Sequence, residues 1–221
     1  MNPAEEIAGQ EGFAGCWLLA PGFFSYYAKR KTEGELHHLG RRLSVDVRAD
    51  YPWADRIALL IYPYRPYPAS ACISGYYVAS NTAYHAAGRV ISCLGERGIR
   101  AERADVPIRE LCLRAGIATA LKNGLLSFGE FGSRVVCQTL AIRIGLPAAE
   151  TEWKEDADGD GPAFDPRCRK CSACGRACPS KAIKTDGFRF RNCLRGKLEG
   201  DIIPDEAKSG LPFLFGCEWC Q

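Results

Sequence analysis

The chain has 221 residues, of which 47% are apolar and 25% are charged, a composition typical of a globular protein with a hydrophobic core. This length suits one large domain, or one medium and one small domain. The net charge of +3 is too small to indicate nucleic-acid binding by itself. Glu5, Glu6 and Glu11 stand where a secretion signal would be positively charged, so we expect a cytoplasmic protein that does not bind a membrane.

Two segments near the N-terminus are candidates for buried structure. The uncharged run 12–28 is broken by Pro21 and Gly22, which predicts a buried segment followed by a turn rather than a membrane span. The apolar run 57–62 ends at Pro63 and predicts a buried strand.

Two helices are expected after this strand. Ser80 or Asn81 can cap the first helix, which should end near Gly95. The second should start at Pro107 and stop before Gly116. Helical spacing predicts that the apolar face of the first helix consists of Tyr84, Ala87, Val90, Ile91 and Leu94.

The segment 134–142 is rich in Val and Ile and predicts another strand. Since helices and strands are mixed, residues 1–150 are expected to form an α+β domain. Residues 151–166 are acidic and contain glycines and prolines, which predicts a solvated linker that includes Asp165. The remaining residues, 167–221, are then a second and smaller domain.

The predicted linker contains one pattern with an alternative interpretation. Asp156-x-Asp158-x-Asp160-Gly161 copies the first half of a calcium-binding loop. Arg167 stands where that loop needs a bidentate glutamate, which favours a plain linker.

The distribution of the 12 cysteines carries the strongest functional signal. Scattered single cysteines are usually small buried apolar residues, whereas cysteines crowded at fixed spacing are usually metal ligands. The scattered set is Cys16, Cys72, Cys93, Cys112 and Cys137. The crowded set is Cys168, Cys171, Cys174, Cys178, Cys193, Cys217 and Cys220.

The first four crowded cysteines follow the pattern C-x2-C-x2-C-x3-C-P, the bacterial ferredoxin signature for [4Fe–4S] clusters. A tight loop with this spacing brings three thiolates to three corners of one cube, while the cysteine before the proline serves a second cube. One cluster would then be held by Cys168, Cys171 and Cys174, whose fourth ligand is not identified. The second would be held by Cys178, Cys193, Cys217 and Cys220.

The fourth ligand of the first cluster would fall three residues beyond Cys220, whereas the given sequence stops at Gln221. Because Cys217-x2-Cys220-Gln221 resembles the beginning of another C-x2-C-x3-C-P run, we expect that the sequence is truncated there. Structural zinc is the alternative, but it usually takes two C-x2-4-C pairs and gives no reason for a run that closes in Cys-Pro.

Basic residues surround the crowded cysteines. They favour a solvated face that offsets the charge of the clusters, and the docking of an acidic electron donor or of RNA is the alternative. They are Lys181, Lys184, Arg189, Arg191, Arg195 and Lys197.

Three stretches resemble epoxyqueuosine reductase, the cobalamin-dependent iron–sulfur enzyme family of queuosine tRNA modification. The first is the 55–62 strand region with Ile73-Ser-Gly-Tyr and Ala83-Tyr-His. The second is 113–126 with Gly132-Ser133 behind it, and the third is the double-cluster module that ends in Gly216-Cys-x-x-Cys-Gln. The order of the stretches matches that of the family, and they span most of the chain from residue 55.

The resemblance implies a nitroreductase-like α+β domain that binds cobalamin, followed by a ferredoxin-like double [4Fe–4S] domain. It also implies an enzyme that passes electrons from the clusters to cobalamin to reduce tRNA-bound epoxyqueuosine or a small molecule. The electron donor would be an external flavodoxin or ferredoxin, and tRNA is a candidate partner. The residues that fall where the family lines the corrin site are Gly116, Lys122, Gly132 and Ser133.

The chain departs from the family at one position of the substrate site. Ala83 stands where the family places an acidic proton donor, so Tyr84 and His85 are the remaining candidates for acid–base catalysis. Tyr84 also fits the apolar face of the predicted helix, where it would be a core aromatic. A non-catalytic ferredoxin-like electron carrier without cobalamin is the alternative function.

Overall fold

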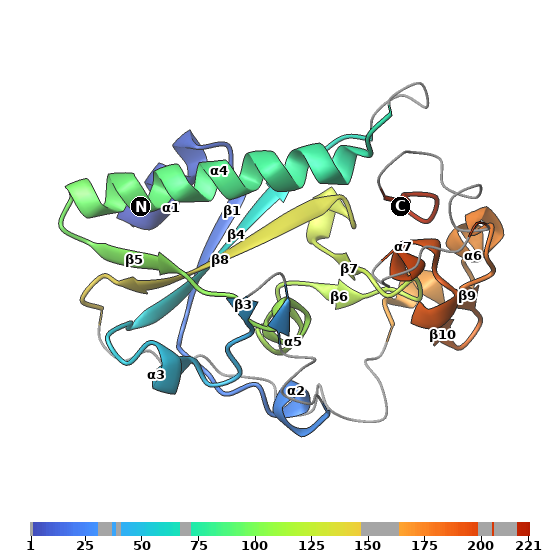
Figure 1. Cartoon of the computed structure of the whole chain (residues 1–221), viewed down its shortest axis with the longest axis horizontal. Helices are drawn as coiled ribbons and strands as arrows, with labels where there is room; N and C mark the ends of the chain where they lie inside the picture. The colour runs from blue at the N-terminus through green and yellow to red at the C-terminus, as the bar shows by residue number, and fades with distance from the viewer. Residues whose placement is uncertain are drawn as a thin grey trace. The chain divides into compact units, whose positions relative to one another are not determined.

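The computed structural model describes residues 2–30, 37–38, 41–66, 72–146, 164–198, 205 and 216–221. The chain divides into two compact units, each assembled from separated segments (Figure 1). The first unit comprises 1–63, 82–117 and 136–161, and the second comprises 64–81, 118–135 and 162–221. The predicted division into 1–150, 151–166 and 167–221 stays a prediction.

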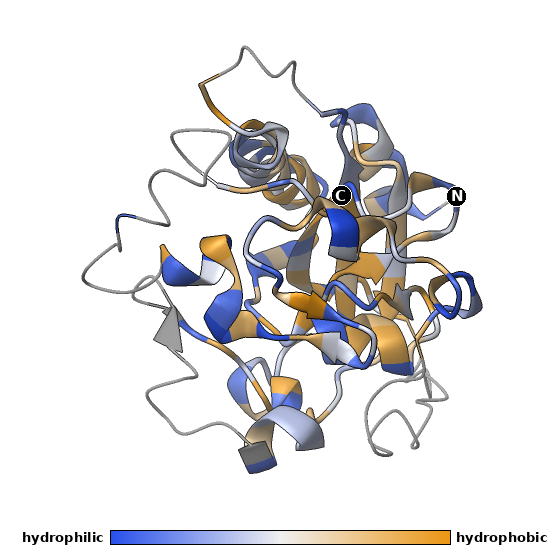
Figure 2. Ribbon diagram, turned by 90° about the vertical axis from the view of Figure 1, so that its right-hand side faces the viewer, coloured by the Kyte–Doolittle hydropathy of each residue, from blue (hydrophilic) through white to orange (hydrophobic). Residues whose placement is uncertain are grey.

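The first unit is built on a four-stranded sheet in the order β1-β4-β8-β5. β1 pairs with β4 and β5 pairs with β8, both antiparallel. The first six residues of β4 are buried, as expected for a strand with apolar residues on both faces, and Figure 2 shows the hydrophobic colouring of this region. The strands are β1 (Gly15–Leu19), β4 (Arg56–Pro63), β5 (Arg100–Arg103) and β8 (Val135–Arg143). The predicted strands at 57–62 and 134–142 are therefore confirmed.

Five helices accompany the sheet, and none of the helices in the described ranges combines the length and apolar character needed to cross a bilayer. The predicted helix from Pro107 is confirmed, with Pro107 as its N-cap residue. The short strands β2 (His37–His38) and β3 (Arg41–Arg42) pair with each other. The helices are α1 (Pro3–Gln10), α2 (Ser25–Arg30), α3 (Val47–Asp50), α4 (Gly75–Glu96) and α5 (Ile108–Arg114).

α4 differs from its prediction in two ways. It begins at Gly75 rather than after Ser80 or Asn81, because the apolar periodicity continues back through Ala79 and no proline interrupts it. Its buried face includes the predicted Ala87, Val90 and Leu94, but Tyr84 is exposed and Ile91 is only half-buried. The face consists of Ala79, Ala83, Ala86, Ala87, Val90 and Leu94.

Tyr84 is consequently not a core residue. Its side chain is 40% exposed, while Ala83 beside it is fully buried. The guanidinium carbon of Arg103 lies 3.7 Å from the centre of the Tyr84 ring. The prediction of a core aromatic at this position is wrong, because alanines occupy the positions that face the sheet.

The second unit contains short elements around a small apolar core. Cys178, Ala182 and Ile183 form this core, and Phe188 packs against it. The elements are β6 (Thr119–Ala120), β7 (Leu126–Ser127), the 3₁₀-helices η2 (Gly129–Phe131), η4 (Pro166–Cys168) and η5 (Phe190–Asn192), α6 (Ala173–Ala177), β9 (Ile183–Lys184), β10 (Gly187–Phe188) and α7 (Leu194–Lys197). β6 pairs with β7 and β9 with β10.

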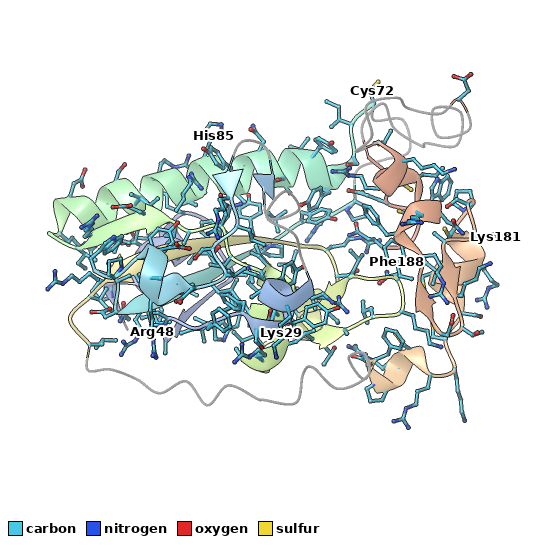
Figure 3. The ribbon with its side chains drawn as sticks, turned by 60° about the horizontal axis from the view of Figure 1, so that its bottom comes forward. Lys29, Arg48, Cys72, His85, Lys181 and Phe188 are labelled. Carbon is cyan, nitrogen blue, oxygen red and sulfur yellow. The ribbon has the colours of Figure 1, made fainter. Side chains whose placement is uncertain are left out.

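Asp165 and Cys72 differ in exposure from what the sequence predicts. The aspartate pattern 156–161 lies outside the described residues, whereas Asp165, expected in a solvated segment, is 5% exposed. Among the scattered cysteines, Cys112 is buried as expected, but Cys72 is exposed (Figure 3). Its segment precedes α4 and does not contribute to the core.

Candidate functional site

Local structure explains how the first cysteines are presented. Cys168 closes the 3₁₀-helix η4, and Cys174 lies in the one-turn helix α6, whose last turn is closed by the N–H of Cys178 donating to the carbonyl of Cys174. Cys171 lies in the turn between them and is exposed. Short helical turns joined by a tight turn thus carry these thiols.

Electrostatic interactions between thiols divide the cysteines into two neighbourhoods. Cys174 interacts with Cys168 and Cys171. Cys217 interacts with Cys193 and Cys178, and Cys220 interacts with all three. The weakest contribution to Cys220 comes from Cys174, which belongs to the other neighbourhood.

The thiols differ in acidity for identifiable reasons. Burial raises the pKa of Cys220 to about 12, and the neighbouring thiolates of Cys217 and Cys193 add to this effect. Burial also raises the pKa of Cys174 and of Cys217. Such thiols stay protonated until a metal binds, because only a strong positive charge stabilises their thiolates.

Cys178 is the exception in its neighbourhood. Burial raises its pKa, but hydrogen bonds outweigh this effect, so the net pKa is lowered. The N–H of Ala182 lies 3.3 Å from its sulfur and the Ser180 hydroxyl lies 3.5 Å from it. Backbone N–H groups aimed at sulfur are the kind of contact that tunes an iron–sulfur cluster.

Within the described residues, no three Cys, His, Asp or Glu side chains converge closely enough to hold a single metal ion. The ligands of one zinc ion would all lie about 2.3 Å from it, whereas the ligands of a cube bind separate iron atoms. The assignment of the cysteines to clusters therefore stays a prediction.

A cavity of about 440 Å³ joins the cysteines to residues singled out for the corrin site. Its lining includes Cys168, Cys171, Cys174 and Cys220 together with Lys122, Gly132, Ser133 and Trp219. All of these residues belong to the second unit.

The backbone at Gly132 is open to a ligand. Its φ of +59° is favourable for glycine, and a Cβ atom added there would meet nothing within 4 Å. A flat ligand can therefore approach this main chain closely. Lys122 also borders the cavity, and its Nζ donates a hydrogen bond to the carbonyl of Arg169 at 3.5 Å.

The structure leaves three of the predicted site residues outside this cavity. Gly116 follows α5 with a φ of +67° and belongs to the first unit, as do Tyr84 and His85. The Tyr84 and His85 rings lie edge to face with their centres 5.7 Å apart. His85 is exposed on the outer side of α4 (Figure 3).

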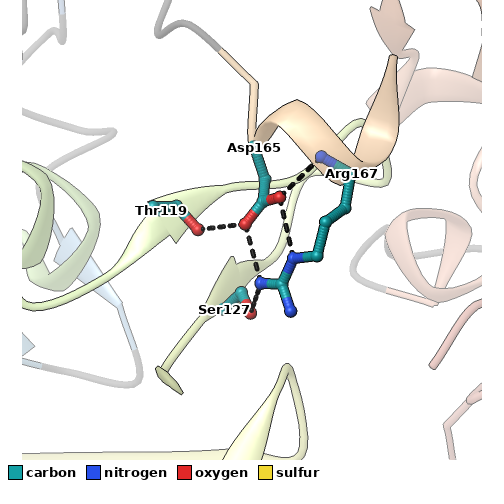
Figure 4. A network of polar contacts seen from close by, with 4 residues as sticks. All are labelled: Thr119, Ser127, Asp165 and Arg167. Atoms are coloured by element: carbon teal, nitrogen blue, oxygen red, sulfur yellow. Dashed lines mark hydrogen bonds and ion pairs between the residues drawn. The ribbon is translucent and has the colours of Figure 1, made fainter. Parts of the chain in front are cut away.

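Sequence reasoning missed an ionic network just before Cys168. The Asp165 carboxylate accepts hydrogen bonds from the Arg167 guanidinium at 2.7 and 2.9 Å and from the Thr119 hydroxyl at 2.8 Å (Figure 4). The same guanidinium donates to the Ser127 hydroxyl at 3.2 Å. The network connects the β6–β7 hairpin to the cysteine segment. The Asp-Pro pair at the start of η4 was the available signal, since aspartate often caps a helix that begins with proline.

A second missed set of contacts anchors the C-terminal cysteine pair. The Asn123 amide donates to the carbonyl of Cys220 at 2.8 Å, and Arg134 donates to the carbonyl of Gln221 at 2.7 Å. The Tyr64 hydroxyl lies 2.6 Å from the Gln221 amide oxygen. No local sequence pattern predicts these contacts, because the partners are 87 to 157 residues apart.

Comparison with known proteins gives consistent results. No protein-family model matches the chain. An epoxyqueuosine reductase from Leadbetterella byssophila is 28% identical over 97% of this chain and 75% of its own length. One from Lactococcus garvieae is 30% identical over 49% of this chain and 28% of its own length.

Solved structures support the same fold. The Bacillus subtilis epoxyqueuosine reductase matches with a TM-score of 0.67 at 20% identity, over 99% of this chain and 62% of that chain. An epoxyqueuosine reductase with an epoxyqueuosine-modified tRNA stem loop matches with a TM-score of 0.69 at 19% identity, over 99% of this chain and 62% of that chain. A catabolic reductive dehalogenase matches with a TM-score of 0.52 at 14% identity, over 82% of this chain and 25% of that chain.

The chain thus spans about three quarters of the Leadbetterella relative and less than two thirds of these solved chains. The relatives are named as reductases, and the sequence matches and the fold agree. The chain is thus similar to epoxyqueuosine reductases in sequence and in fold.

Proposed function

We propose that the chain is a reductase that uses two [4Fe–4S] clusters and a bound cobalamin to reduce a modified nucleoside of tRNA. The observation that carries this proposal is the cavity shared by the cluster cysteines and by Lys122, Gly132 and Ser133. Clusters and a corrinoid that exchange electrons must lie close together, and this arrangement supports such proximity.

The donor set of the second unit suits iron–sulfur clusters. Cys178, Cys193, Cys217 and Cys220 would hold one cluster, with N–H donors near Cys178 as further support. Cys168, Cys171 and Cys174 would hold three corners of the other. Loading would release protons from Cys174, Cys217 and Cys220, since burial raises the pKa of these thiols.

Three residues would line the corrin. Gly132 offers bare main chain, while Lys122 and Ser133 offer polar side chains at the same cavity. When bound, the cobalamin would supply the low-potential reducing centre, and the protein would orient it and exclude water. Tyr84 and His85 are proposed as acid–base groups, because they are the titratable side chains nearest in sequence to Ala83.

The tRNA substrate is proposed from the relatives. One structure of the family contains an epoxyqueuosine-modified tRNA stem loop. An electron carrier without cobalamin is the second candidate, favoured by the buried Ala83 at the position where the family has an acid.

The test is anaerobic reconstitution with iron, sulfide and cobalamin, followed by gel filtration, metal analysis and EPR. The proposal expects about eight iron atoms per chain and a retained corrinoid. Gly132→Leu, which fills the open space at the cavity, should lower corrinoid retention while iron content stays unchanged. Iron without corrinoid would favour the electron carrier, and zinc without iron would reject both.

A further inference from the structure

A second cavity lies against the same cysteine turn. It measures about 230 Å³, and Cys171, Cys174 and Lys122 line it as they line the larger one. Its other charged lining residues are Arg176, Lys181 and Lys184. No acidic side chain and no aromatic ring is among the described residues that line it.

The surrounding segment does not neutralise these cations. Residues 164–198 contain ten Lys and Arg but only two Asp. Both aspartates are engaged by arginines outside the cavity, Asp165 by Arg167 at 2.7 Å and Asp186 by Arg189 at 2.5 Å. The hydrogen bond from Arg189 is the main reason that the pKa of the Asp186 carboxyl is lowered, and Lys184 contributes least to it. The cavity therefore keeps a strong positive potential.

The cations are directed to solvent rather than only to the cysteines. Arg176, Lys181 and Lys184 are all exposed, and Figure 3 shows Lys181 at the outer edge of its segment. Lys181 also has a φ of +53°, a conformation that lysine seldom adopts.

We propose that this basic cavity is the docking site for an acidic electron-donor protein. The inference rests on the proposed function, because it requires the cluster of Cys168, Cys171 and Cys174. In each docking event the reduced donor loses one electron and this cluster gains one, and no bond is formed or broken. Two such events supply the two electrons of a substrate reduction.

The observations favour a protein over RNA as the partner. Two ligands of the receiving cluster form part of the cavity wall, as short-range electron transfer requires. Single-stranded RNA is usually recognised by stacking on aromatic rings, which this lining does not provide. Trp219, which is 50% exposed, lines the larger cavity instead.

The test compares the reconstituted protein with the double variant Lys181→Glu/Lys184→Glu. Stopped-flow absorbance records cluster reduction by a reduced flavodoxin, and photoreduced deazaflavin serves as the small reductant. Lys29→Glu is the matched control, since Lys29 is exposed in the first unit (Figure 3).

For the unmodified protein, the rate with flavodoxin should fall at least about tenfold between about 20 and 500 mM salt. The double variant should be at least about tenfold slower at low salt and should lose most of the salt dependence. Its rate with deazaflavin, and both rates of Lys29→Glu, should match those of the unmodified protein.

An unchanged flavodoxin rate in the double variant would overturn the docking proposal. Loss of stem-loop RNA binding in that variant, with an unchanged flavodoxin rate, would assign the cavity to RNA instead. Failure of the unmodified protein to assemble clusters would overturn the proposed function itself, so the two failures are distinguishable.

Discussion

Asp165 and Arg167 flank a single proline and bind each other through both main chain and side chain. The Asp165 carboxylate accepts hydrogen bonds from the N–H of Arg167 at 2.9 Å and from its guanidinium at 2.7 and 2.9 Å. Cys168 is the next residue, and its N–H donates to the carbonyl of Asp165 at 2.8 Å. The carboxylate therefore fixes the main chain from which the first cysteine ligand projects.

Asp165→Asn should destabilise the second unit and loosen the first cysteine turn. The amide keeps the shape but loses the charge that strengthens the bonds to Arg167, which we expect to cost about 1–2 kcal/mol. Thermal unfolding and iron retention after reconstitution measure the effect. Asp186→Asn is the control, because both members of that ion pair are exposed and should contribute little. Equal effects of the two variants would contradict the structural role of Asp165.

The same network predicts a pH dependence of stability. The side-chain hydrogen bond from Arg167, helped by the N–H of Arg167 and the Thr119 hydroxyl, holds the pKa of the Asp165 carboxyl well below its usual range. A depressed pKa in the folded state means that the stabilisation is present above the unfolded value of about 4 and is lost as the pH falls through the folded pKa.

Thermal unfolding measured from about pH 6 down to about pH 3 should therefore show a steeper loss of stability for the unmodified protein than for Asp165→Asn. The difference in unfolding free energy between the two should be largest near neutral pH and shrink in acid. Parallel curves over this range would show that the Asp165 carboxylate does not supply this stability.

Gly216 should be needed to position Cys217. Its φ is +87°, and a Cβ atom there would lie 2.9 Å from the Ser74 hydroxyl and 3.3 Å from the Tyr77 ring. Gly216→Ala combines backbone strain with this close contact, so we expect a loss of about 2 kcal/mol and a lower iron content.

Gly98→Ala separates the effect of backbone strain from the effect of the close contact. Gly98 also has a positive φ, +72°, but a Cβ atom there would meet nothing within 4 Å. Thermal unfolding should show a loss of only about 1 kcal/mol from conformational strain, and cluster assembly should be unchanged. A Gly216→Ala variant as stable and as rich in iron as Gly98→Ala would argue against the close contact.

Local signals explain which parts of this structure could be predicted. The strands at 57–62 and 134–142 are continuous apolar or β-branched runs, and the helix at Pro107 has a favoured first-turn residue, so each carries its own pattern. The cysteine motif is equally local. The shared cavity and the anchors on Cys220 could not be predicted, because they join Asn123 and Lys122 to segments about 50 to 100 residues away.

The wrong prediction for Tyr84 in α4 also has a physical reason. Alanine and tyrosine both fit a helical stripe by spacing alone, and Tyr84 carries the larger apolar surface. The small Ala83 is buried, whereas Tyr84 lies against Arg103 on the exposed side of the helix. Helical periodicity predicts the buried face of a helix to within one position. The space available beside the sheet then decides which of two neighbouring residues is buried.

Ala83→Asp tests whether this helix can carry the acid that the family places at this position. Ala83 is fully buried between Ala79 and Ala86 on the face of α4. A carboxylate there would have no solvent, so we expect a loss of about 3–5 kcal/mol. Its pKa would be raised by burial, so the loss of stability should grow as the pH rises above about 4.

Asn81→Asp, at an exposed position of the same helix, should leave thermal unfolding unchanged. An Ala83→Asp variant that unfolds at the same temperature as the unmodified protein at neutral pH would show that α4 tolerates a carboxylate here, and that the alanine reflects the reaction rather than the packing.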